Sequence, residues 1–328
     1  MLDKSNISEE KIVIDIVENK LDPSILDILL KDRTTGRNII WATDYYTSYK
    51  EEGYGFYDEI TVDSITGSEH GLVICPRIKK SKEEQEARSR NKAEVFTAAW
   101  ICNKQINLID SAWFGGSSPF NVEIECGWKT NYEKISFPQG KTWQDYVNDT
   151  RLEMTCGEGP YLVSRFDVTS GNKIPVKDRI GILDRKLRVI SENTPDERSD
   201  YNIEKWRLNA LRALSSIYGF EWQGDSLLLA REAILETYIE FYEEKWGRRP
   251  NTQALKKVAE IISWNIWQMD GLKCGIPGAT PTEQITELFE GHEEVDPDCR
   301  LCRIMNWKQI KPLKGEVIIF KKLINSEV

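Results

Sequence analysis

The chain has 328 residues, of which 40% are hydrophobic and 30% are charged, and its formal net charge is −9. Such a composition is typical of a soluble globular protein, and the length suffices for one large core or for a core domain with an added module. No apolar run approaches the ~20 residues that span a membrane, and the first residues have no apolar signal core. We therefore expect a cytoplasmic protein without a membrane partner. Seven cysteines in a chain of this length argue against a disulfide scaffold.

The negative net charge argues against broad attachment to nucleic acid, which requires Lys and Arg to neutralise phosphates. A local basic face could still bind DNA, and the best candidate is residues 77–82, continuing to Arg88, Arg90 and Lys92. Glutamates are interleaved with this stretch, so a solvated charged helix is the stronger interpretation. Cys299 and Cys302 form one CxxC pair, but no second pair lies nearby, which favours two reduced thiols over a zinc site.

Residues 1–90 are predicted to form an N-terminal α+β module. Apolar side chains recur with helical spacing over residues 22–30, and the polar residues 34–38 predict a turn into a strand at 39–41. A polar loop rich in Tyr and Gly is expected to follow.

Residues 91–328 alternate strand and helix patterns, which favours an α/β fold with a parallel sheet and helices on both of its faces. The pattern at 227–241 predicts the helix after the second strand. The first and second strands are separated by far more residues than one crossover helix needs, so residues 167–200 predict an insertion over the carboxyl edge of the sheet. The four strands are expected at 152–156, 216–222, 262–269 and 303–307.

The segment 152–163 reads Leu-Glu-Met-Thr-Cys-Gly-Glu-Gly-Pro-Tyr-Leu-Val and is the most informative motif. The acidic Glu153 lies in the presumed first strand, and a Cys-Gly-x-Gly turn formed by Cys156, Gly157 and Gly159 follows. Glycines at such a point let the backbone turn sharply and approach a ligand. On its own the motif is weak, because an ordinary tight turn has the same pattern.

This segment resembles the first motif of the S-adenosyl-L-methionine-dependent DNA adenine methyltransferases, Asp-Pro-Ala-Cys-Gly-Ser-Gly-x-Phe-Leu. Three further segments resemble motifs of that family in the family's order. Residues 93–97 resemble its Gly-Glu-x-Phe/Tyr-Thr-Pro element, although Ala98 replaces the proline; residues 217–222 and 229–232 resemble its second strand and helix; residues 265–272 resemble its third motif. The four cover about residues 90–275, and the whole chain is similar to bacterial proteins termed subunit M of restriction systems.

The resemblance implies a Rossmann-like, doubly wound sheet that binds S-adenosyl-L-methionine outside the carboxyl ends of its strands. Glu221 would accept hydrogen bonds from both ribose hydroxyls, Trp222 would lie against the adenine, and Asp270 would accept from the exocyclic amine. A surface carboxylate, a core ring and a helix cap are the respective alternatives. The implied cofactor-binding residues are Phe96, Thr97, Glu153, Cys156, Gly157, Gly159, Glu221, Trp222 and Asp270.

The fourth motif of amino-methylating enzymes, Asn/Asp-Pro-Pro-Tyr/Phe, is where the chain departs from the family, because no Pro-Pro pair occurs in it. The nearest equivalent places Asn306 to accept from the target amine and Trp307 to stack on a flipped base. Loss of the prolines changes the direction of the backbone carbonyl. An ordinary strand role for both residues is the alternative, and no metal is expected.

The function that the resemblance implies is that of a DNA methyltransferase subunit of a restriction-modification system, which transfers a methyl group to adenine N-6 of double-stranded DNA. A non-catalytic cofactor-binding subunit that supports a partner nuclease or methyltransferase is the alternative, and a Rossmann-like enzyme with another substrate is a third. No target-recognition domain is visible, so reading of bases would need the N-terminal module or a specificity subunit as partner.

Overall fold

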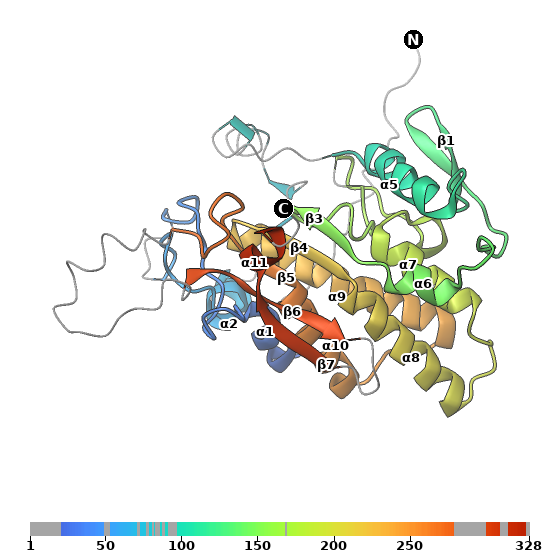
Figure 1. The fold of residues 1–328 in the computed structure, drawn as a ribbon. Coiled ribbons are helices and arrows are strands. Elements are labelled where there is room, and N and C mark those ends of the chain that lie inside the picture. Colours follow the sequence, from blue (N-terminus) through green and yellow to red (C-terminus); the bar gives the residue numbers. More distant parts are fainter. Residues whose placement is uncertain are drawn as a thin grey trace, which may run out of the picture.

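The computed structural model describes residues 21–48, 53–70, 73–76, 97–167, 169–278, 300–308 and 314–325, together with residues 79, 80, 82, 86, 89 and 90. Over these residues the chain is a mixed α/β protein (Figure 1). None of the helices in this part of the chain is long and apolar enough to cross a membrane. The predictions for Phe96, Cys299 and several basic residues of the 77–92 stretch fall outside the described residues.

A three-stranded parallel sheet forms the centre of the protein. Its strands are β3 (Arg151–Met154), β4 (Ile217–Glu221) and β5 (Ile266–Gln268), in that spatial order. Leu152 of β3 pairs with Tyr218 of β4, and Phe220 of β4 pairs with Trp267 of β5. The first three predicted strands are thus confirmed as parallel neighbours.

The third strand is shorter than predicted. Residues 262–265 belong to α10 (Thr252–Asn265), and the strand begins only at Ile266. Val258, Ala259, Ile261 and Ile262 are buried on the inner side of this helix. A continuous apolar run fits a buried helix as well as a buried strand, which explains the misplaced boundary.

Helices pack on one face of the sheet. They are α7 (Ile182–Glu192), α8 (Asp200–Ser215), α9 (Gly224–Trp246) and α10. Side chains of β4 alternate accordingly, with Ile217 in the large core on the helical side and Phe220 in a smaller cluster on the other. The helix predicted after the second strand is confirmed as α9, whose first residue is Gly224.

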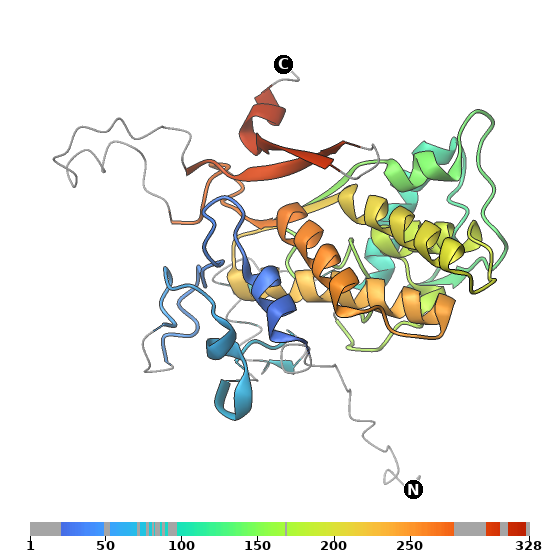
Figure 2. The ribbon, with the colours of Figure 1, turned by 90° about the horizontal axis from the view of Figure 1, so that it is seen from below.

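The other face carries a β-hairpin and the short helix that follows it. The hairpin consists of β6 (Arg303–Lys308) and β7 (Lys314–Ile319), which pair antiparallel and are followed by α11 (Phe320–Asn325). Figure 2 shows the hairpin and the helices on opposite sides of the sheet. A strand at 303–307 is confirmed, but the prediction that it extends the parallel sheet is wrong, because its partner in the described residues is β7.

The N-terminal region begins with α1 (Pro23–Leu30), which confirms the predicted helix. Asp22 caps it by accepting a hydrogen bond from the Ser24 N–H at 2.9 Å. The segment that contains Trp41 and Ala42 then lies alongside residues 56–60. The Trp41 N–H donates to Asp58 O, and the Ala42 N–H donates to Phe56 O. Two short helices, α2 (Val62–Ile65) and α3 (Gly67–His70), follow. Apolar side chains of this region lie in the same cluster as those of α7 to α10, so the described part of the N-terminal module shares the main core.

Between the N-terminal region and β3 lie α5 (Ala99–Phe114), the hairpin of β1 (Asn121–Ile124) with β2 (Gly127–Thr130), and α6 (Trp143–Asn148). After β3 come the 3-10 helix η2 (Val176–Asp178) and α7. Residues 167–200, which were predicted to form an insertion over the sheet edge, include α7. Its residues Leu183, Leu187 and Ile190 are fully buried among the other helices.

Candidate cofactor site at the carboxyl ends of the parallel strands

The glycine turn follows β3 directly and is built from residues with positive φ. Thr155, Gly157 and Gly159 have φ values of 49°, 53° and 76°. A Cβ atom on Gly157 would meet no atom within 4 Å, whereas one on Gly159 would lie 3.5 Å from Ala230 Cβ. Gly157 therefore leaves its backbone open to a ligand, and Gly159 lets α9 pack close to the turn.

Glu221, the last residue of β4, is joined to this turn by its carboxylate. One oxygen accepts from the Gly157 N–H at 2.9 Å, and the other accepts from the N–H groups of Trp222 at 2.9 Å and Gln223 at 3.2 Å. The residue is only 9% exposed. Burial raises the pKa of this carboxyl, and the three backbone donors oppose that shift. A carboxylate has about four lone-pair sites, so one further donor can still bind to it, at the oxygen that accepts from Gly157.

The side chain of Glu153 of β3 contacts the segment that follows the glycine turn. Its carboxylate accepts from the N–H groups of Leu162 at 3.0 Å and Tyr161 at 3.4 Å, and it fixes the segment that follows the glycine turn. Burial raises the pKa of Glu153 to about 8. Cys156 is buried, and burial raises the pKa of its thiol as well. Both residues shape the turn from within.

Trp222 and Thr97 are half-buried at the periphery of this site. The Trp222 indole N–H donates to Ala42 O at 3.0 Å, and the ring meets that of Phe56 edge-on with centroids 6.4 Å apart. The indole is thus held against the N-terminal region. The Thr97 carbonyl accepts from the Cys102 thiol at 3.6 Å, just before α5 begins.

Asp270 lies just past the end of β5. Glu221 pairs in register with Gln268, and the Met269 N–H donates to Glu221 O at 2.9 Å. Asp270 is therefore at the same edge of the sheet as Glu221. One of its carboxylate oxygens accepts from the N–H groups of Leu272 at 2.9 Å and Lys273 at 3.1 Å, which is the geometry of a turn cap. The second oxygen lies 4.0 Å from Lys273 Nζ.

Asn306 and Trp307 lie at the opposite end of the sheet. The Trp307 indole N–H donates to the side chain of Asn265, which directly precedes β5, at 2.7 Å. The preceding Met305 carbonyl accepts from the hydroxyl of Tyr218, near the start of β4, at 2.9 Å. β6 thus runs from the carboxyl ends of the strands toward their amino ends. Asn306 itself is exposed and pairs with Glu316. The structure does not bring these two residues together with Glu221 and Asp270.

Arg231 is a structural residue whose role the sequence did not reveal. Its buried guanidinium donates to the carbonyls of Leu29 and Lys31 at the end of α1, and to those of Ser263 and Ile266 around the end of α10. Burial lowers the pKa of this side chain to about 9. Arg231 lies in the segment that resembles the family's second helix, but only the fold shows that it ties two helix ends together.

Within the basic stretch 77–92, which was a candidate for DNA binding, Lys80 forms a buried ion pair inside the protein. Lys80 is buried, with its ammonium 3.7 Å from the carboxylate of Asp225 at the start of α9. A lysine in this position does not face DNA phosphates. Cys302 is also buried, and its thiol donates to Gln268 O at 3.3 Å. Among the described residues, no group of three or more His, Cys, Asp and Glu side chains is arranged to hold a metal ion.

No family model, no curated protein and no solved structure matches this chain.

Proposed function

We propose that the chain binds S-adenosyl-L-methionine at the carboxyl ends of β3, β4 and β5. We further propose that it serves in the cytoplasm as the methyltransferase subunit of a restriction-modification system and methylates adenine N-6 of DNA. The three parallel strands would belong to a Rossmann-like, doubly wound sheet. The hydrogen bond between the Gly157 N–H and the Glu221 carboxylate carries the proposal. It couples the glycine turn to the acid at the end of the next strand, which are the two elements that the family resemblance pairs.

The residues at this edge fit the chemistry of the cofactor. A Cβ atom at Gly157 would meet no atom within 4 Å, Glu221 is a fixed carboxylate with one site left for a ribose hydroxyl, and Asp270 has one oxygen without a close backbone donor in the described residues. The cofactor would supply an activated methyl group on a sulfonium. The protein residues would bind and orient it, since precise placement of both reactants is the main tool of such a transfer.

Titration calorimetry of the purified protein with S-adenosyl-L-methionine tests this proposal. We expect one site per chain. The demethylated product should compete for this site, and tighter binding of that product there would not contradict the proposal. Absence of any heat of binding with folded wild-type protein would refute the cofactor assignment.

A second candidate is a non-catalytic cofactor-binding subunit that supports a partner nuclease or methyltransferase. The position of Trp307 beside Asn265 favours it, because the pair proposed to hold the target base lies away from the cofactor edge. Transfer of tritiated methyl groups to duplex DNA, with and without a specificity or nuclease subunit, separates the two candidates. Transfer of methyl groups to DNA supports the first candidate. Cofactor binding without methylation in either mixture supports the second, and transfer to another acceptor supports the third interpretation, an enzyme with a different substrate.

A further inference from the structure

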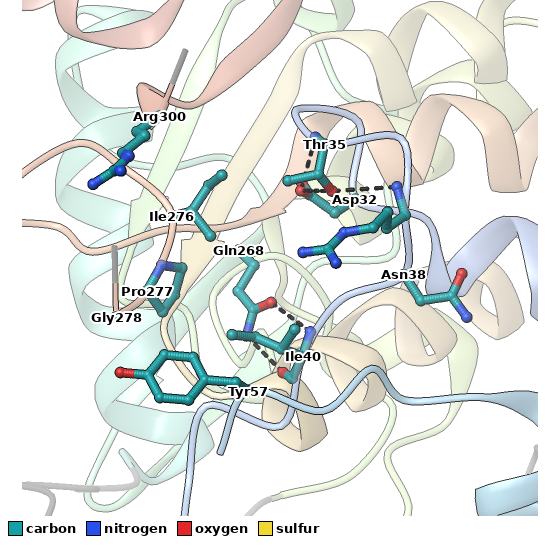
Figure 3. Close-up of a pocket in the computed structure, with 11 residues that line it drawn as sticks. Asp32, Thr35, Asn38, Ile40, Tyr57, Gln268, Ile276, Pro277, Gly278 and Arg300 are labelled. Atoms are coloured by element: carbon teal, nitrogen blue, oxygen red, sulfur yellow. Dashed lines mark hydrogen bonds between the residues drawn. The ribbon is translucent and has the colours of Figure 1, made fainter. Parts of the chain in front are cut away.

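A separate cavity of about 250 Å³ lies between the N-terminal region and the segment that follows β5. We call it the Arg37–Arg300 pocket after the two arginines in its walls. Figure 3 shows Asp32 and Thr35 on one side, Ile276 and Arg300 on the other, and Tyr57 at its lower edge. The pocket is smaller than the roughly 300–1,000 Å³ that drug-sized ligands occupy. It therefore suits a ligand smaller than S-adenosyl-L-methionine.

The polar groups of Gln268, Ile40 and Asp32 in the pocket already have hydrogen-bond partners within the protein. The Gln268 amide accepts from the Ile40 N–H at 3.0 Å and donates to Ile40 O at 2.8 Å. The carboxylate of Asp32 is buried and accepts from the N–H and the hydroxyl of Thr35, at 3.0 and 2.6 Å. Donors in its own turn thus offset part of the negative charge of Asp32, which lines the pocket.

Two arginines from separate segments line the pocket, Arg37 before β5 in the chain and Arg300 after it. The Arg37 side chain is 68% exposed, and its nearest carboxylate, on the half-exposed Glu59, is 3.7 Å away. An exposed pair at that distance is weak. Arginine forks match the geometry of phosphate oxygens, so two of them at one pocket favour a phosphate ligand.

An exposed aromatic ring completes the pocket. Tyr57 is 67% exposed; Phe56 packs against it edge-on, with ring centroids 4.7 Å apart, and the backbone of Gly278 lies close to one edge of the ring. Ile276 and Pro277 provide an apolar surface near this ring. A ring open to solvent beside two arginines matches the combination by which proteins hold single nucleotides, with a base stacked on an aromatic side chain and a phosphate beside basic groups.

We propose that the Arg37–Arg300 pocket binds one unpaired nucleotide of a DNA strand, with its phosphate near the two arginines and its base on Tyr57. The nucleotide must be unpaired, because a paired base exposes its edges in the grooves but not its face. DNA as the source of this nucleotide rests on the proposed function, whereas the chemistry of the pocket does not. Neither Glu221 nor Asp270 lines the pocket, which would anchor the strand during methyl transfer.

Fluorescence anisotropy with a labelled short single-stranded DNA tests the proposal on the full chain. We expect Arg37→Ala and Arg300→Ala each to weaken binding several-fold and to reduce the slope of log affinity against log salt by roughly 0.7, the value for one phosphate contact on a single strand. Tyr57→Ala is expected to weaken binding about 5- to 100-fold with an unchanged salt slope, since stacking involves no counterion. Tyr57→Phe keeps the ring and should bind like the wild type.

Matched surface substitutions serve as controls. Arg249 is an exposed arginine with glutamate neighbours, and Tyr201 is an exposed tyrosine on α8. Arg249→Ala and Tyr201→Ala should bind DNA like the wild type. Equal losses in these controls, or wild-type affinity in the pocket variants, would overturn the proposal.

Further arms identify the source of the nucleotide. A duplex with one extrahelical nucleotide should bind more tightly than the fully paired duplex, and only weak competition is expected from deoxyadenosine monophosphate. Tight binding of the monophosphate with no preference for a strand would overturn the proposal in favour of a free nucleotide. Calorimetry with S-adenosyl-L-methionine is run in parallel. If the wild-type protein binds DNA through the pocket but does not bind S-adenosyl-L-methionine, the proposed function is refuted and this inference stands. If the pocket variants bind DNA as tightly as the wild type, only this inference is refuted.

Discussion

The backbone of Ile40 is joined to the side-chain amide of Gln268 by two hydrogen bonds, of 3.0 Å to its oxygen and 2.8 Å from its nitrogen. The same nitrogen donates to Trp222 O at 2.8 Å. A single amide thus gives an N-terminal segment the two bonds that a neighbouring strand would give, and it holds that segment at the edge where Glu221 and Asp270 lie. The N-terminal segment therefore lies beside the strand ends that carry the candidate cofactor site.

Loss of this amide should loosen the N-terminal segment. Gln268→Ala leaves the Ile40 N–H and C=O and the Trp222 carbonyl without their partner, so we expect the free energy of unfolding to fall by about 1–3 kcal/mol. Urea denaturation measures the loss, and proteolysis should cut more readily within residues 42–56. Gln139→Ala, at an exposed position, is the control and should have no effect. Equal stability of the two variants would show that the amide does not hold the N-terminal region.

Gly224 is expected to be intolerant of any side chain. A Cβ atom there would lie 2.1 Å from Ile40 O and 2.8 Å from Ile60 Cδ1, so the N-terminal segment would have to move away from the start of α9. We expect Gly224→Ala to destabilise the protein by about 3 kcal/mol, on the scale of an overpacked core. Gly116→Ala meets no atom within 4 Å and is the matched control. Thermal unfolding of the two variants should differ clearly, and coincident transitions would contradict the close approach.

Glu153 should make stability depend on pH. Burial raises the pKa of its carboxyl from 4.5 to about 8, so between these values the folded protein holds a proton that the unfolded chain has released. The free energy of unfolding should consequently fall as the pH rises from about 4.5 to 8, by on the order of a few kcal/mol. Glu153→Gln should flatten this dependence and be the more stable protein at pH 8. Denaturation over this pH range is the measurement, with Glu133→Gln at an exposed position as control. An unchanged slope in Glu153→Gln would contradict the assignment.

Glu221 should dominate cofactor affinity. Glu221→Ala removes an ionised acceptor from the proposed ribose site and also releases the Gly157 N–H, so we expect binding of S-adenosyl-L-methionine to weaken by about 1–3 kcal/mol. Glu221→Gln keeps one acceptor for the backbone and should lose less. Calorimetry measures both variants against Glu125→Ala, which lies at an exposed position. Cofactor affinity that is indifferent to Glu221 would remove the ribose role.

Local patterns were sufficient to predict that the parallel strands and α9 exist, because apolar runs end there at glycine and acidic residues. They did not locate the start of β5, since its apolar run continues from α10. The residues that shape the site from outside could not be predicted in this way. Arg231 donates to Leu29, Lys80 pairs with Asp225, and Gln268 bonds Ile40; each partner lies far away in the chain, so no local pattern announces it. The placement of β6 depended in the same way on its pairing with β7, which a search for a fourth parallel strand does not consider.

Asn306 provides the decisive test of where the chemistry occurs. Trp307 is held to Asn265 at the amino ends of the strands, so Asn306→Ala should leave the affinity for S-adenosyl-L-methionine unchanged. Its effect on methyl transfer then separates the two candidate functions. A preorganised amide that accepts from the target amine would, when lost, lower the rate by about 10²-fold or more, and β6 would then have to approach the cofactor edge in the complex with DNA. An unchanged rate in the presence of a partner subunit would place the reaction on the partner. Tritiated methyl transfer to duplex DNA is the measurement, and Asn148→Ala, at the end of α6, is the matched amide substitution.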